Sequence, residues 1–290
     1  MTQPLLFQPI ALRSLTLGNR VAVAPMCQYS AVDGIAQDWH LQHYGAMAAS
    51  GPGLITIEAT GISPEGRISP RCLGLYDDAT EAALTRLVGA LKSFGNSHVA
   101  IQLAHAGRKG SAAPPSQGPG PAKQDGWETI SASDIPFDAD WPSPKAATEA
   151  DLTRIRQAFV DGAKRALRAG FDAIEIHSAH GYLLHQFLSP ITNQRTDQYG
   201  GSLDNRMRFP LSVVEAVRAV WPADKPLGIR ISATDWVEGG WDIDEAVIYA
   251  KAFKAAGIDY VCVSSGGLVS YAKIPLGPGY QLHLARRIRQ

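Results

Sequence analysis

The sequence lacks an excess of charge of either sign, because its 290 residues include 27 basic and 27 acidic side chains. No net field therefore favours binding to nucleic acid or to an anionic membrane surface. It also lacks the ~18 consecutive apolar residues that a membrane-spanning helix needs. Residues 1–20 do not contain the basic and apolar regions of a secretory signal. From these absences we expect a soluble, cytoplasmic protein.

Paired cysteines are missing as well. Cys27, Cys72 and Cys262 are far apart and odd in number, and no CxxC pair occurs. This usage is typical of a reducing compartment and argues against a disulfide framework. It also offers no cysteine-ligated zinc or iron–sulfur site, and we expect no bound metal.

What the sequence does contain is a regular succession of short apolar runs and helical segments. The runs are nearly continuous in hydrophobicity, as in parallel strands buried on both faces, and cover residues 20–26, 53–59, 98–104, 171–177, 226–232 and 259–265. Helices are expected between them at 38–50, 78–95, 148–170, 204–221 and 242–257, with Thr148 as an N-cap and Gly170 and Gly257 as stops. This alternation predicts an α/β fold with a parallel sheet. Residues 107–147, rich in Gly, Pro, Ser and Ala, are expected to form a loop excursion over one end of it.

Six strands are compatible with a doubly wound sheet or with most of a barrel, and both fold classes bind ligands at the carboxyl ends of their strands. The segments that follow the runs there carry polar, aromatic and sulfur-bearing side chains: PMCQYS, EATGISPEGRISP, QLAHAGRKG, HSAHGYL, RISATDW and SSGGLVS. No GxGxxG or GxxxxGKS motif follows the first run, which disfavours a Rossmann dinucleotide site and a P-loop.

The histidines at one strand end allow several interpretations. His177 and His180 could be a structural pair in the core, or zinc ligands with His105 or His40 as a third. The zinc interpretation is weak, because the usual motif places its histidines on a helix with a glutamate between them. Tyr182 beside them could simply wedge a loop.

Other strand-end residues are ambiguous singly. Cys27 alone would be a small buried hydrophobe. Arg230 is harder to explain, because a guanidinium in an apolar strand needs an anionic or electron-rich partner. Gln102, also in an apolar strand, needs hydrogen-bond partners. Their shared position at strand ends favours one common site.

Taken together, these residues lie in motifs that resemble the Old Yellow Enzyme family. The matching segments are APMCQYSA, EATGISPEGRI, IQLAHAGRK, HSAHGYLLHQFLSPITNQRTDQYGGSLDNRMRF and RISATDW, in order from about residue 5 to about residue 285. PMCQY and HxxHGYL resemble the bacterial, thermophilic-like ene-reductase branch. The resemblance implies a (β/α)₈ TIM barrel that binds FMN non-covalently and reduces activated C=C bonds with NADPH or NADH.

The resemblance also implies catalytic roles. His177 and His180 are similar to the pair that hydrogen-bonds the substrate's carbonyl oxygen and stabilises the charge that develops there. Tyr182 is similar to the general acid that protonates the α-carbon. Cys27 resembles the residue that tunes the flavin potential, and Tyr29 resembles a second phenol facing the substrate.

A cofactor site follows from the same resemblance. The positions similar to those contacting the flavin ring are Pro25, Met26, Cys27, Ala59, Gln102 and His177. Arg230 resembles the arginine whose charge stabilises reduced flavin. Hydride is then expected to pass from NAD(P)H to FMN and on to an electron-poor alkene, with ping-pong kinetics. Trp39, Arg108 and Lys109 are expected at the rim, and a homodimer or homotetramer is implied.

The family's barrel has two βα units beyond those recognisable here. We therefore expect one FMN-binding barrel domain over residues 1–290, truncated after about six βα units and without the FMN phosphate contacts that the later units carry. A fragment of a longer product is the favoured explanation, ahead of completion by a second chain and of a remnant without flavin.

Other functions stay open at this point. An iron–sulfur flavoprotein reductase would need a cysteine cluster that three scattered cysteines cannot supply. A divalent-metal barrel hydrolase could use Asp235 and Glu58 with the histidines. A non-catalytic barrel fragment that needs a complementing chain is the third possibility.

Overall fold

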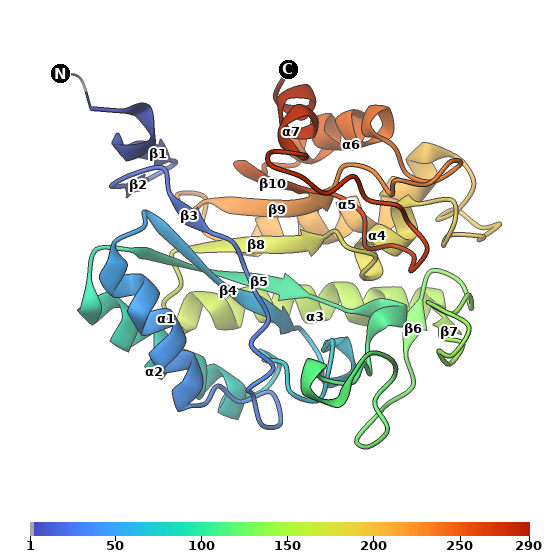
Figure 1. Cartoon of the computed structure of the whole chain (residues 1–290), viewed down its shortest axis with the longest axis horizontal. Helices are drawn as coiled ribbons and strands as arrows, with labels where there is room; N and C mark the ends of the chain where they lie inside the picture. Colours follow the sequence, from blue (N-terminus) through green and yellow to red (C-terminus); the bar gives the residue numbers. More distant parts are fainter. Residues whose placement is uncertain (1–2) are drawn as a thin grey trace.

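The computed structural model describes residues 3–290, which form a curled parallel sheet with helices packed against it (Figure 1). The six strands pair in the order β10-β9-β8-β5-β4-β3, and every pairing is parallel. Their bounds are Ala22–Val23 (β3), Leu54–Gly61 (β4), His98–Ala104 (β5), Ala173–Ser178 (β8), Leu227–Ser232 (β9) and Tyr260–Ser264 (β10). All six predicted strands are therefore confirmed, the first as only a short bridge to β4.

The central strands are buried on both faces, as their continuous hydrophobicity predicts. Every residue of β4 is buried, and β8 is buried throughout. Figure 1 shows the arrowheads of β5 and β8 pointing toward the same end of the sheet, where the excursion carrying β6 and β7 lies. The carboxyl ends of the strands thus meet at one edge of the molecule.

Helices occupy the five predicted segments. They are Asp38–Ser50 (α1), Asp78–Phe94 (α2), Glu149–Arg168 (α3), Leu203–Val220 (α5) and Ile243–Ala255 (α6), and a further helix, Leu282–Arg289 (α7), follows β10. The Thr148 side chain caps α3 by accepting from Asp151 N, as expected, and Gly170 leaves that helix at φ +89°, a conformation that favours glycine. No helix within residues 3–290 is long and apolar enough to cross a membrane.

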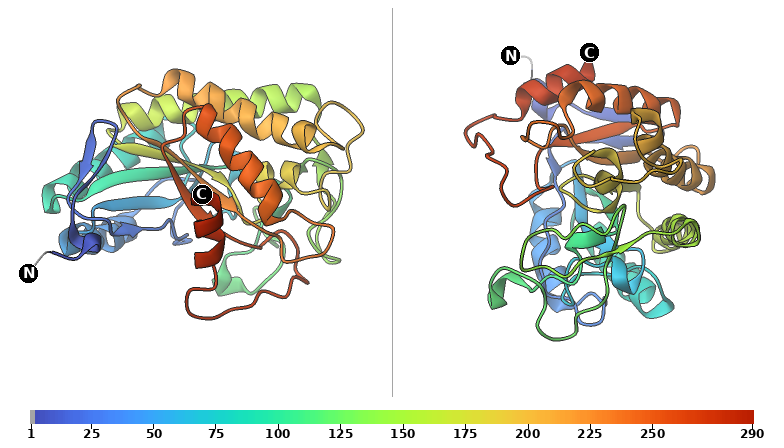
Figure 2. Two further views of the ribbon diagram at one scale, coloured as in Figure 1. Left: turned by 90° about the horizontal axis from the view of Figure 1, so that it is seen from above. Right: turned by 90° about the vertical axis from the view of Figure 1, so that its right-hand side faces the viewer.

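The sheet agrees with the predicted barrel only in part, because over the residues that the structure describes it is curled but not closed. The sheet curls as in a barrel (Figure 2), but β3 and β10 are its two edges and do not pair with each other within residues 3–290. A groove of ≈ 560 Å³ runs beside β10, lined mainly by α6, α7 and β10 residues such as Phe253, Val261 and Ile288. The curled α/β sheet is confirmed, whereas an eight-stranded barrel truncated after six units stays a prediction.

Several short elements were not predicted. An antiparallel hairpin joins Ile10–Leu12 (β1) to Leu15–Leu17 (β2), and Leu183–Leu188 (α4) follows β8. The excursion at 107–147 contains Ile130–Ser131 (β6) paired in parallel with Lys145–Ala146 (β7). Four 3₁₀ turns complete the described chain, at Leu5–Phe7 (η1), Pro64–Gly66 (η2), Gly107–Lys109 (η3) and Pro115–Gln117 (η4).

Candidate active site

A cavity at the carboxyl ends of the strands gathers most of the predicted site residues. Its lining consists of Pro25, Cys27, Ala59, Ile68, Gln102, His177, His180, Tyr182 and Arg230. Two predicted residues do not line it. The Met26 side chain is 49% exposed, and Tyr29 packs instead in a small apolar cluster with Cys27 and Tyr182.

The end of β8, which carries His177, and the loop after it, which carries His180 and Tyr182, hold the two histidines and the tyrosine together. The ring centroid of His177 lies 5.2 Å from that of His180 and 4.9 Å from that of Tyr182, and both ring pairs meet edge to face. The loop turns through two left-handed residues, His180 at φ +58° and Gly181 at φ +72°. Only glycine fits the second position, because a Cβ there would lie 2.4 Å from Gly267 O.

The histidine pair is neutral. Burial, together with the neighbouring cations, lowers the pKa of His177 well below its usual value. Burial also lowers the pKa of His180 to about 3. His177 Nδ1 accepts a hydrogen bond from Ala179 N at 3.2 Å, so the ring proton lies on Nε2. His177 therefore presents an N–H donor on the side of the ring away from its own backbone.

His180 is held on two sides. Its backbone N donates to Ser232 Oγ at 2.9 Å, and its Nε2 lies 2.7 Å from Ser264 Oγ. When the Ser264 hydroxyl donates to Nε2, the ring proton lies on Nδ1. Ser264 was missed by the sequence analysis, although it ends the sixth strand, in the SSGG segment already noted as polar.

A lysine lies against the loop and the tyrosine. Lys109 Nζ donates to His180 O at 2.8 Å and to Gly267 O at 2.7 Å, and it lies 5.0 Å from the centre of the Tyr182 ring. Burial raises the pKa of the Tyr182 phenol well above its usual value, so the phenol keeps its proton.

Cys27 has a sulfur neighbour that the sequence did not predict. The pKa of the Cys27 thiol is raised well above its usual value, first by a hydrogen bond with the Cys72 thiol and then by burial. The adjoining backbone is fixed by Glu58, whose Oε2 accepts from Gln28 N at 2.9 Å. Cys27 thus lines the cavity as a neutral thiol, on a loop that the hydrogen bond to Glu58 holds in place.

Two buried polar side chains, Gln102 and Arg230, line the cavity, and a buried carboxylate contacts the first of them. Gln102 Nε2 donates to Glu175 Oε1 at 2.7 Å. The Nε and Nη1 atoms of Arg230 are buried and have no hydrogen-bond partner among the described residues. Burial raises the pKa of Glu175 to about 7, and the nearby Arg230 charge opposes that rise. Glu175 was missed, although a carboxylate in an apolar strand carries the same signal as Arg230.

The residues present fit a flavin. An unpartnered buried guanidinium requires an electron-rich ligand, and the carbonyl edge of an isoalloxazine ring supplies one. The apolar atoms of Pro25, Cys27 and Ala59 provide a wall for its face. Arg230 and Gln102 would hold the polar edge.

The alternative metal site is not supported by the contacts of its proposed ligands. Among residues 3–290, no group of three or more His, Cys, Asp or Glu side chains is arranged to hold a metal ion. His105 Nδ1 accepts from Gly107 N, and His40 Nε2 lies 3.3 Å from Glu58 in the interior. Asp235 Oδ2 accepts from Ser189 Oγ and Trp241 N, so that carboxylate is already occupied by donors of the chain itself.

Two predicted rim residues differ in placement. Trp39 is 48% exposed and donates from its indole to Gln28 Oε1 at 3.2 Å. Arg108 is buried rather than at the rim, because its guanidinium donates to the carbonyls of Ile135, Pro136 and Leu268. Arg108 therefore ties the excursion to the loop after β10.

Comparison with known proteins gives a consistent result. Residues 5–281 match the sequence profile of the NADH:flavin oxidoreductase / NADH oxidase family. An NADPH dehydrogenase of Geobacillus thermodenitrificans is 48% identical over 287 residues, covering 98% of this chain and 79% of the relative. The NADH:flavin oxidoreductase FG08077 of Gibberella zeae is 43% identical over 302 residues, covering 98% of this chain and 73% of the relative.

Solved structures share the fold. Morphinone reductase superposes with a TM-score of 0.81 at 31% identity, covering 99% of this chain and 78% of that one. An Old Yellow Enzyme homologue from Zymomonas mobilis superposes with a TM-score of 0.79 at 26% identity, covering 96% and 79% of the two chains. The predicted resemblance, and with it FMN and a nicotinamide co-substrate, is confirmed. The chain belongs to the NADH:flavin oxidoreductase / NADH oxidase family, as a flavin-dependent enzyme of the Old Yellow Enzyme type.

Proposed function

We propose that residues 1–290 act as one FMN-binding barrel domain of a cytoplasmic NADPH dehydrogenase that reduces activated C=C bonds. The substrates would be α,β-unsaturated carbonyl compounds and nitroalkenes. Relatives named NADPH dehydrogenase at 44–48% identity support the nicotinamide part of this proposal. The substrate class rests on the cavity itself.

The observation that carries the proposal is the neutral histidine pair. His177 holds its proton on Nε2, because Nδ1 is occupied by Ala179 N. His180 offers Nδ1–H when Ser264 donates to its Nε2. Two N–H donors from rings 5.2 Å apart suit one carbonyl or nitro oxygen. Because the site is buried, such donors stabilise the negative charge that develops on that oxygen more strongly than water does.

Tyr182 supplies the proton in this scheme. Its phenol stays protonated because burial raises its pKa, and its ring lies 4.9 Å from that of His177. A substrate whose oxygen is held by the histidines would therefore place its α-carbon near the phenol. Lys109 over the ring lowers the cost of releasing that proton.

FMN, when bound, supplies the hydride chemistry. The chain's part would be to hold and tune the ring: Arg230 would donate to its electron-rich edge, Gln102 would donate to its polar atoms, and the Cys27 thiol would line its face, since all three side chains line the cavity. Glu175 keeps the Gln102 amide oriented by accepting its hydrogen bond.

A phenol titration tests the histidine role. A phenol such as 4-hydroxybenzaldehyde is expected to bind the FMN-loaded protein and give a long-wavelength charge-transfer band. The double variant His177→Ala/His180→Ala should lose that band while keeping FMN. His98→Ala is the matched control, since His98 begins β5 at the opposite end of the sheet and bonds Thr16 O. An unchanged band in the double variant would remove the histidines from the oxygen site.

A further inference from the structure

Another buried histidine, His185, contacts the loop that carries His180 and Tyr182. His185 belongs to α4 and is fully buried, as is Asp235 in the segment after β9. His185 Nε2 lies 3.0 Å from Asp235 Oδ1, and neither atom has a hydrogen-bond partner elsewhere in residues 3–290. His185 does not line the cavity, so it contacts neither cofactor nor substrate there.

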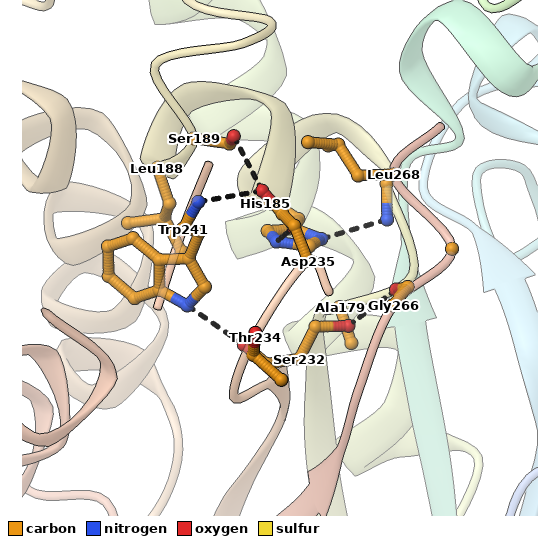
Figure 3. Close-up of polar contacts among 12 residues, drawn as sticks. Ala179, His185, Leu188, Ser189, Ser232, Thr234, Asp235, Trp241, Gly266 and Leu268 are labelled. Carbon is orange, nitrogen blue, oxygen red and sulfur yellow. Dashed lines mark hydrogen bonds and ion pairs between the residues drawn. The ribbon is translucent and has the colours of Figure 1, made fainter. Parts of the chain in front are cut away.

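The carboxylate of Asp235 is firmly anchored. Figure 3 shows it between Ser189, Trp241 and His185. Its Oδ2 accepts from Ser189 Oγ at 2.7 Å and from Trp241 N at 2.8 Å. The indole of Trp241 in turn donates to Ser232 O at 2.9 Å. These contacts orient Oδ1 toward His185.

The other ring nitrogen of His185 accepts a hydrogen bond from a backbone amide. Gly181 N donates to His185 Nδ1 at 2.9 Å. An amide N–H is always a donor, so Nδ1 must be the acceptor and the ring proton must lie on Nε2, toward the carboxylate. Asp235 thereby selects the tautomer that can accept from Gly181.

We propose that His185 and Asp235 are positioning residues that fix the Gly181 peptide, and with it the relative placement of His180 and Tyr182, for binding of the substrate oxygen. Gly181 is the single residue between these two side chains. The carbonyl of the same peptide is held as well, since His180 O accepts from Lys109 Nζ at 2.8 Å. The next peptide is held through Gly181 O, which accepts from Gln186 Nε2 at 2.6 Å. The pair therefore fixes the His180–Gly181 peptide, the first of the two peptides that join the oxygen-binding ring to the proton donor.

Changing the carboxylate to an amide should reverse the tautomer. In Asp235→Asn, Trp241 N–H still needs an acceptor, so the amide oxygen stays on that side and the NH₂ faces His185. Nε2 must then accept, the ring proton moves to Nδ1, and it opposes the Gly181 N–H. Because two buried N–H donors cannot satisfy each other, we expect the loop that carries Gly181 to move away from His185.

The matched control is Ser189→Ala. It removes one hydrogen bond from the same carboxylate but leaves Oδ1 and the His185 tautomer as they are. His185→Asn is a second control, because its amide oxygen can replace Nδ1 as the acceptor for Gly181 N–H.

The first test needs no flavin. In ¹⁵N-histidine-labelled protein, long-range ¹H–¹⁵N spectra should show His185 protonated on Nε2, with assignment by the loss of its signals in His185→Asn. In Asp235→Asn the proton should be on Nδ1 and the His177 and His180 signals should shift; in Ser189→Ala they should not. Wild-type His185 protonated on Nδ1, or unmoved His177 and His180 signals in Asp235→Asn, would overturn the proposal.

The second test rests on the proposed function and uses FMN-loaded protein. Phenol affinity should fall about tenfold or more in Asp235→Asn, and by about two- to threefold at most in Ser189→Ala and His185→Asn. Equal losses of phenol affinity in Asp235→Asn and Ser189→Ala would mean that the pair only supports the fold, and would overturn the proposal. A wild-type protein that binds FMN but no phenol would contradict the proposed function instead, and the spectra would still decide on the pair.

Discussion

Acid should destabilise this protein before its surface carboxylates titrate, because several histidines are buried in the neutral form. The pKa values of His177, His180 and His105 lie below their usual value of 6.5, with His180 at about 3 and His105 at about 4. Below about pH 6.5 the unfolded chain therefore binds protons at these histidines, whereas the folded chain leaves them neutral. Their contribution to stability is present above pH 6.5 and is lost as the pH falls below it.

The expected size follows from these pKa values. Between about pH 7.5 and about pH 5.5, each buried histidine lowers the free energy of unfolding by about 1.4 kcal/mol. Lys109, with a pKa lowered to about 7 by burial, adds a smaller loss of about 1 kcal/mol. Glu175 acts in the opposite direction, because its raised pKa of about 7 makes the folded state gain a proton and recover about 2 kcal/mol. The net loss is about 3 kcal/mol, a large part of a typical folding free energy.

Urea denaturation across this pH range measures the loss, and two variants separate its sources. Glu175→Gln removes the opposing group, so the loss should increase to about 5 kcal/mol, whereas His180→Gln should reduce it to about 2 kcal/mol. The carboxylates with lowered pKa, such as Asp151 at about 2, act only at lower pH. A pH-independent unfolding free energy, or a smaller pH dependence in Glu175→Gln, would refute the assigned protonation states.

Three further substitutions have defined outcomes. Tyr182→Phe should slow reduction of an enone about 10²- to 10⁴-fold while NADPH bleaches bound FMN at nearly the wild-type rate in stopped flow; equal slowing of both would contradict its role as proton donor. Arg230→Met should weaken FMN binding about tenfold or more in a fluorescence titration, and unchanged affinity would exclude contact with the ring. Gly181→Ala should lower the melting temperature more than Gly201→Ala, since both have positive φ but only the former Cβ would meet a neighbour, Gly267 O at 2.4 Å; equal shifts would contradict the close approach.

The sheet and the cavity could be predicted because their signals are local. Continuous apolar runs gave the six strands, and the rule that ligands bind at the carboxyl ends of parallel strands pointed to His177, Tyr182 and Arg230. Of the predicted site residues, all except Met26 and Tyr29 line the cavity.

The residues that were missed act through contacts across the fold. Ser264 reaches His180, and Cys72 reaches Cys27, from segments that are distant in the sequence. Met26 is 49% exposed, although its neighbours Pro25 and Cys27 both line the cavity. Arg108 is charged and follows a strand, yet the excursion buries it by offering carbonyl acceptors. Only the tertiary structure supplies these partners.

The most direct test of the proposed function is an anaerobic absorption measurement on the purified protein with FMN added. We predict protein-bound flavin bands near about 370 and 450 nm, loss of the longer-wavelength band on addition of NADPH, and its return when 2-cyclohexenone is added without oxygen. A protein that retains no FMN, or whose reduced flavin is not reoxidised by the enone, would contradict the account.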